Sequence, residues 1–108
     1  PLSISKSQIL LNLGQYFESE EIIRDQLLRK NDSPDLWFML SETQKTSQNI
    51  VGYHQSRADY FLLLGQDEKA LNQLEFALQL TQNNFQVSDR IMTKIIEIKK
   101  SLQNSRGL

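Results

Sequence analysis

His54 is the only histidine in this chain of 108 residues, and there is no cysteine. A zinc site needs three or four ligands held close together, and no such cluster surrounds His54 in the sequence. The same lack of partners excludes a catalytic triad built on histidine. We therefore interpret His54 as a packed or surface residue of a helix. We expect no bound metal, no cofactor and no catalysis by this chain.

Three acidic residues, Glu18, Glu20 and Glu21, are the closest candidates for a pair of catalytic carboxylates. They stand where a helix is predicted to begin, and the positive end of the helix dipole stabilises carboxylates there. We interpret them as a solvated helix start. Trp37 could stack on a ligand, but its spacing from other apolar residues favours a place in the core.

Basic side chains gather near the carboxyl end of the chain, around Glu97. They are Lys94, Lys99, Lys100 and Arg106. We interpret this group as a solvated helix face, with docking against an acidic surface as the alternative.

The overall charge excludes several classes of partner. Lys and Arg number 12 and Asp and Glu number 13, which gives a net charge of −1. Nucleic-acid binders normally carry a basic excess, so we expect no nucleic-acid partner. No apolar run approaches the ~20 residues that a membrane span needs. The chain begins with Pro1 rather than Met, and we therefore expect it to be a fragment of a longer protein.

The elements that must position these residues are helices, because apolar residues recur at helical spacing throughout. The sequence predicts one all-α domain over 1–108, with about six antiparallel helices and a tail at 104–108 that frays. The predicted helices cover 3–13, 18–30, 35–45, 50–64, 67–80 and 86–103. Gly14 and Gly65 are predicted to end helices, and Ser33 followed by Pro34 is predicted to begin one.

The run from Gly65 to Leu80 resembles the second half of a tetratricopeptide repeat. Gly65 stands at the turn, Ala70 and Ala77 take the small positions, and Leu74 takes the large apolar position between them. Small residues let two helices approach closely, so Leu74 is predicted to be buried between them. The resemblance implies a right-handed helical solenoid that binds other proteins.

The preceding residues match the same motif unevenly. Ala58 and Phe61 fit the helix before Gly65, and Trp37, Leu40 and Ser41 fit the opening of a further repeat. A weaker copy has Gly14 at its turn, followed by Ser19 and Ile23 in the small and large positions. Both the third and the fourth predicted helices resemble first helices of a repeat, so the alternation of the motif slips between them.

A narrower resemblance covers about half of the chain. The run G-Y-H-Q-S-R-A-D-Y-F-L-L-L-G and the helices after it are similar to the tail of bacterial zinc metallopeptidases of the β-barrel assembly-enhancing type. The residues that match are His54, Arg57, Ala58, Tyr60, Gly65, Ala70, Leu74 and Ala77. The family's zinc motif, His-Glu-x-x-His, is absent from this chain.

This resemblance implies an interaction module in the bacterial periplasm, carrying no catalysis itself, with zinc only in an upstream protease domain. Its partners would be outer-membrane assembly factors, a substrate or that protease domain. The alternative is a cytosolic tetratricopeptide scaffold or adaptor that has no connection with proteolysis. In both cases the chain is expected to be a monomer.

Repeat geometry places certain side chains on the concave face that binds partners. These are Gln55, Asp59 and Leu62 on the fourth predicted helix, and Gln8 and Asn12 on the first. Amide side chains both donate and accept hydrogen bonds, which suits recognition of the backbone of an extended peptide. Ordinary solvated polar positions are the alternative interpretation of these residues.

Overall fold

A computed structural model of the protein describes residues 4–106, with side chains from 14 to 104. This part of the chain is all-α and forms five helices. They are α1 (Ile4–Arg29), α2 (Pro34–Thr46), α3 (Ile50–Leu63), α4 (Asp67–Gln79) and α5 (Phe85–Arg106). The predicted frayed tail is therefore helical as far as Arg106, and residues 107–108 lie outside the described part.

The predicted number of six helices is wrong because Gly14 does not end a helix. Residues 4–29 form one continuous helix that passes through Gly14. A glycine inside a helix costs only about 1 kcal/mol relative to alanine, and the hydrogen bonds on either side maintain the helix. The weaker repeat copy fails with it, because Ser19 is exposed on the same helix instead of following a turn.

Two helices end in the same hydrogen-bonded motif with a left-handed residue. After α3, Gly65 has a φ of +75°, and the amides of Gly65 and Gln66 donate to Leu62 O and Phe61 O. This is the Schellman arrangement that glycine favours. After α2, Gln48 takes the same place with a φ of 66°, although it carries a side chain.

Helices α2, α3 and α5 each begin after a residue whose side chain caps the helix. Ser33 caps α2 by accepting a hydrogen bond from Leu36 N through its side chain at 3.4 Å, and Pro34 occupies the first turn, as predicted. Asn49 Oδ1 accepts from Gly52 N at 3.1 Å at the start of α3. Asn84 Oδ1 accepts from Val87 N at 3.2 Å at the start of α5. These caps satisfy amides that have no partner inside their own helix.

The buried side chains form two apolar clusters along the array. The larger joins α3, α4 and α5 and contains Ala58, Ala70, Leu74, Ala77, Ile91, Ile95 and Ile98. Leu74 is 2% exposed, which confirms its predicted burial between two small residues. The smaller cluster joins α1 and α2 through Ile23, Leu27 and Leu40. Ile22, the residue before Ile23 on α1, is 60% exposed.

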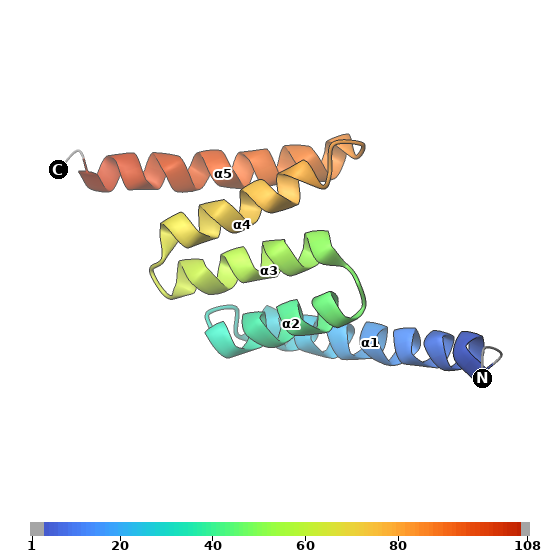
Figure 1. The fold of residues 1–108 in the computed structure, drawn as a ribbon. Helices are drawn as coiled ribbons and strands as arrows, with labels where there is room; N and C mark the ends of the chain where they lie inside the picture. The colour runs from blue at the N-terminus through green and yellow to red at the C-terminus, as the bar shows by residue number, and fades with distance from the viewer. Residues whose placement is uncertain (1–3, 107–108) are drawn as a thin grey trace.

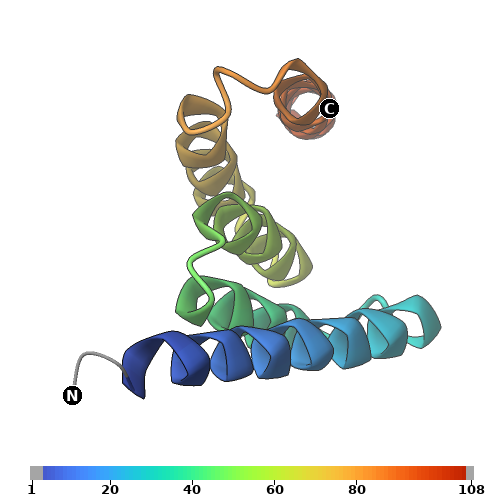
Figure 2. The ribbon, with the colours of Figure 1, turned by 90° about the vertical axis from the view of Figure 1, so that its right-hand side faces the viewer.

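The helices stack in chain order, and each packs chiefly on the one before and the one after it (Figure 1). Their axes turn along the array, so that α5 is seen nearly end-on where α1 lies across the view (Figure 2). The Cα radius of gyration is 16.1 Å, against about 13 Å for a compact domain of this length. The molecule is therefore an elongated array of helices, with α1 and α5 at its two ends.

None of the helices over the described residues combines the length and the apolar character that a membrane span requires.

Candidate functional site

An open groove of about 410 Å³ runs past the start of α3. We call it the amide groove, because four of its side chains are carboxamides. Its lining comes from α1, from the start of α3, and from the turn that joins α4 to α5. The lining residues are Arg24, Asn49, Val51, Gly52, Gln55, Leu80, Thr81, Asn83, Asn84 and Val87. Segments far apart in the sequence therefore build one surface.

The four carboxamides of the amide groove differ in what they already bind. Asn49 and Asn84 use their oxygens to cap α3 and α5. Gln55 and Asn83 make no hydrogen bond or ion pair within the described residues. Each therefore has both a donor and an acceptor available to a ligand.

A buried polar network holds the wall of the amide groove in place. Gln44 of α2 is 1% exposed, and its amide lies 2.6 Å from Ser56 Oγ of α3. We assign this amide from its surroundings, with the nitrogen donating to Gly52 O at 2.8 Å and the oxygen accepting from Arg24 Nη2 at 3.2 Å. Gln44 thus ties α1, α2 and α3 together directly behind the groove.

Gly52 lies in this wall where the surrounding amides leave no room for a Cβ. A Cβ built on Gly52 would lie 2.5 Å from the side-chain amide of Asn49 and 2.7 Å from that of Gln44. Real Cβ atoms do not approach other atoms this closely, so the close contact of α3 with Gln44 depends on glycine.

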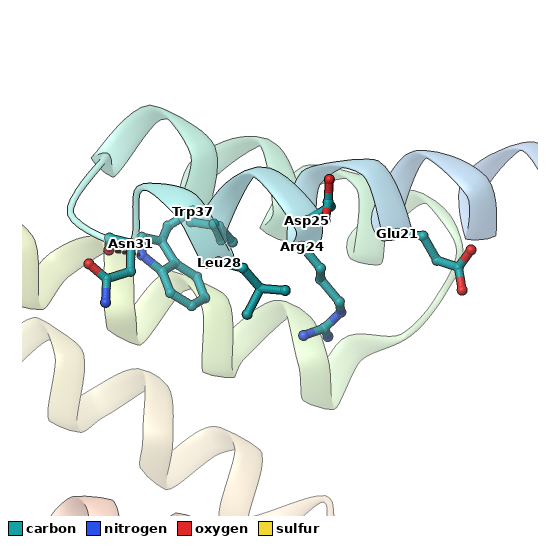
Figure 3. A pocket seen from close by; sticks show the side chains of 7 residues that line it. Glu21, Arg24, Asp25, Leu28, Asn31 and Trp37 are labelled. Atoms are coloured by element: carbon teal, nitrogen blue, oxygen red, sulfur yellow. Dashed lines mark hydrogen bonds between the residues drawn. The ribbon is translucent and has the colours of Figure 1, made fainter.

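A second groove, of about 720 Å³, opens beside Trp37 on α1 and α2 (Figure 3). We call it the Trp37 groove. It is lined by Glu21, Arg24, Asp25, Leu27, Leu28, Asn31 and Trp37. Trp37 is half-buried and is held by a hydrogen bond of 2.9 Å from its indole nitrogen to Asn31 O. Leu28 is 86% exposed, so the groove presents apolar surface to solvent.

The two grooves share Arg24 and are therefore adjacent. Arg24 is held by Glu20, whose carboxylate lies 2.9 Å from Arg24 Nε, and by the oxygen of Gln44. Its guanidinium stands between an apolar section with acidic residues and a polar section with free amides. Such a surface can bind an apolar side chain at one end and an extended backbone at the other.

Arg57 forms a cluster that the sequence analysis did not identify as a unit. Its guanidinium carbon lies 4.3 Å from the ring centroid of Phe38 and 5.3 Å from that of Tyr53. Arg57 Nε donates to Ser41 Oγ at 3.0 Å, and Nη2 lies 2.8 Å from a carboxylate oxygen of Glu42. These contacts fasten α3 to α2, so Arg57 is a structural residue rather than an open ligand site.

His54 also joins two helices. Its Nδ1 lies 2.7 Å from Oε1 of Gln73 on α4, and its ring contacts Tyr53 and Phe76. Within the described residues, no three or more His, Asp or Glu side chains lie together as they would around a metal ion.

The predicted partner-binding residues fall in different places. Gln55 lines the amide groove. Leu62 packs against the larger apolar cluster. A carboxylate oxygen of Asp59 lies 3.2 Å from Nζ of Lys94 on α5. Lys94 belongs to the basic group for which docking against an acidic surface was the alternative interpretation. The side chains of Gln8 and Asn12 lie outside the described residues.

Burial raises the pKa of the Asp59 carboxyl above its usual value of 3.8. The charge of Lys94 and its hydrogen bond act in the opposite direction and do not cancel the desolvation. Asp59 is therefore engaged with another helix and is a weaker candidate for ligand binding than Gln55.

Sequence reasoning missed most of the amide groove. Asn49, Asn83 and Asn84 lie in turns, where the sequence indicates only a break between helices. Arg24 belongs to a helix whose neighbours could not be inferred from its spacing.

No protein-family model, curated protein or solved structure matches this chain, so its function is inferred from the geometry of these grooves.

Proposed function

We propose that this chain is a protein-binding module that holds an extended segment of a partner along the Trp37 groove and the amide groove. The observation that carries the proposal is the shared Arg24, because it makes one binding surface from residues of α1, α2, α3 and α5. The unengaged amides of Gln55 and Asn83 give that surface the means to pair with a backbone.

The proposed mechanism is recognition by shape and hydrogen bonding, with no chemistry by this segment. An apolar side chain of the partner packs on Trp37 and Leu28, and the acidic rim at Glu21 and Asp25 favours a basic residue beside it. The backbone that follows pairs with Gln55 and Asn83. Because Gln44 and the caps already fix the surrounding helices, little conformational entropy is lost on binding.

We further propose that the array is a tetratricopeptide-like solenoid. The α3–α4 hairpin supports this proposal, with Gly65 at its turn and Ala58, Ala70 and Ala77 buried at the helix contacts. The packing of each helix mainly on its neighbours in the chain is also typical of solenoids.

The parent that we propose is a periplasmic zinc metallopeptidase of the β-barrel assembly-enhancing type. Support comes from the resemblance over the residues around His54 and Arg57. In such a parent this module would hold an outer-membrane assembly factor, a substrate or the protease domain itself. The coding sequence before Pro1 tests the idea. A His-Glu-x-x-His helix preceded by a signal peptide supports it, and their absence supports the cytosolic adaptor.

A peptide-display selection on the purified chain tests the binding function itself. We expect enriched peptides with an apolar residue next to a basic one, and fluorescence polarisation of labelled peptides measures their affinity. The double variant Gln55→Ala and Asn83→Ala should weaken binding by about tenfold, because two hydrogen bonds to the ligand are lost.

Two controls make this selection decisive. Gln103→Ala removes an exposed amide of α5 outside both grooves and should leave the affinity unchanged. Melting curves of all variants should coincide, since neither Gln55 nor Asn83 caps a helix. Peptides whose affinity is insensitive to both the groove variants and Leu28→Ala would contradict the proposed surface.

A further inference from the structure

Helix α5 carries two apolar stripes, and only one of them has a partner. Ile91, Ile95 and Ile98 are buried against the larger apolar cluster. On another side of the same helix, Phe85, Met92 and Ile96 are 83%, 41% and 58% exposed. Because α5 is the last helix of the array, no following helix of the described chain covers this second stripe (Figure 1).

The second stripe has the spacing of a seam between two paired helices. Its positions alternate steps of four and three residues, as the apolar positions of a coiled coil do. They are Phe85, Asp89, Met92, Ile96, Lys99 and Gln103. The two apolar residues Met92 and Ile96 occupy the centre, and one acidic and one basic residue flank them.

The charges of this seam are complementary to those of an identical seam that runs in the opposite direction. Asp89 and Lys99 lie equally far from the midpoint of the seam, and so do Met92 and Ile96. In an antiparallel pair of identical helices, Asp89 of each copy therefore faces Lys99 of the other. A two-fold interface requires this self-complementarity, in which each contact occurs twice.

We propose that the occupant of this stripe is a second copy of the chain, paired antiparallel through α5. Met92 and Ile96 pack across the two-fold axis, and two Asp89–Lys99 pairs lie on either side of them. A parallel pair in register would place Asp89 against Asp89 and Lys99 against Lys99, and the like charges disfavour it. Neither Asp89 nor Lys99 has an ion pair within the described residues, so both are available.

The proposed dimer replaces the monomer expected from the sequence. One face of a single helix buries less surface than a standard stable interface, so the dimer is weak and depends on concentration. Lys94 stays with Asp59 on another side of α5, and the proposed peptide surface remains open in each copy. Failure of the dimer would therefore leave the proposed function untouched.

Sedimentation velocity of the purified chain, from low micromolar to several hundred micromolar, tests the proposal. We expect a shift from monomer to dimer across this range. Ile96→Asn should abolish the shift without lowering the melting temperature, because Ile96 is exposed in the monomer. Asp89→Lys and Lys99→Asp should each weaken the dimer roughly tenfold, since each change turns two attractive pairs into two repulsive ones.

Mixing the two charge variants tests whether these charges pair across the seam. A mixed dimer of Asp89→Lys with Lys99→Asp again has opposite charges at both contacts, so the mixture should dimerise as tightly as the original chain. Glu97→Lys changes a charge of similar exposure outside the seam and should have no effect on dimerisation.

Three outcomes would overturn the proposal. The first is a monomer at every concentration tested. The second is a dimer that the changes at Ile96, Asp89 and Lys99 do not affect. The third is a failure of the mixed charge variants to associate while the original chain dimerises.

Discussion

At the scale of single residues, the wall of the amide groove depends on which side chains are missing as much as on which are present. Gln44 can reach Gly52 O and Ser56 Oγ only because no Cβ occupies the space at Gly52. Gly14 has no such role, since nothing lies within 4 Å of the Cβ position there. The same residue type therefore has opposite effects at the two positions.

Substituting alanine at each glycine should separate these effects. Gly52→Ala should destabilise the chain by about 1–3 kcal/mol, the usual cost of forcing an extra methyl group into a packed site. Gly14→Ala should stabilise it by about 0.5–1 kcal/mol, because alanine loses less entropy in a helix. Urea unfolding followed by circular dichroism measures both. A loss of stability in both variants would show that the two environments do not differ in this way.

Asp59 gives the chain a dependence of stability on pH that can be stated with its sign. Its pKa is raised in the folded state, chiefly by burial and despite Lys94, so folding favours the protonated carboxyl. Its contribution to the unfolding free energy is therefore largest below pH 3.8 and falls as the pH rises from there to the folded pKa. Above that pKa the contribution stays at its lower level.

Replacing the carboxyl with an amide should remove this dependence. The unfolding free energy of Asp59→Asn relative to the original chain should rise with pH across that window. Lys94→Met should raise the pKa of Asp59 further, because the opposing charge is lost. Carboxyl carbon NMR shifts during a pH titration measure the pKa directly. A folded pKa below 3.8 in the original chain would contradict the sign of this pH dependence.

At the scale of helices, α2 and α3 end in the same backbone conformation, which is formed by different residues. Both have a left-handed residue that closes the helix, with an amide beyond it donating to a carbonyl in the last turn. At α3 this residue is Gly65, which the sequence analysis identified. At α2 it is Gln48, whose side chain makes the same conformation unfavourable.

Gln48→Gly should therefore stabilise the chain by roughly 1 kcal/mol, because glycine adopts a positive φ without a clash. Thermal unfolding measures the change. Gln66→Gly is the matched control, since Gln66 has a φ of −102° and gains nothing from glycine. Equal stabilisation by both changes would mean that backbone strain at residue 48 is not the cause.

At the scale of the whole molecule, the helices at the centre of the array have more stabilising contacts than the helices at its ends. α3 contacts a helix on each side and carries the Arg57, Gln44 and His54 contacts. α1 and α5 each pack on one neighbour, apart from the ion pair that links Lys94 to Asp59. Helices with fewer neighbours open at lower free energy in such arrays.

Hydrogen exchange followed by mass spectrometry should show this gradient. We expect the amides of α3 to exchange most slowly and those of α5 to exchange faster, with α2 and α4 between them. At high protein concentration the proposed dimer should slow the exchange of α5 alone. Uniform protection across all five helices would contradict an array in which each helix depends on its neighbours.

The sequence by itself determined the helical class, most helix boundaries and the core of the last three helices. These properties are local, because the spacing of Ala70, Leu74 and Ala77 and the residues Ser33, Pro34 and Gly65 act within a turn or two of the helix. Gln55, which was predicted to face a partner, lines the amide groove.

Only the tertiary structure decided which helices meet and what they present together. Gly14 is compatible with both a helix interior and a helix end, and the structure shows that α1 continues through it. Arg24, Asn83 and Trp37 line adjoining grooves because of the way the helices stack, and no sequence period encodes that stacking. Asp59 was predicted to face a partner, yet it meets Lys94, because ion pairs between distant helices depend on how those helices stack.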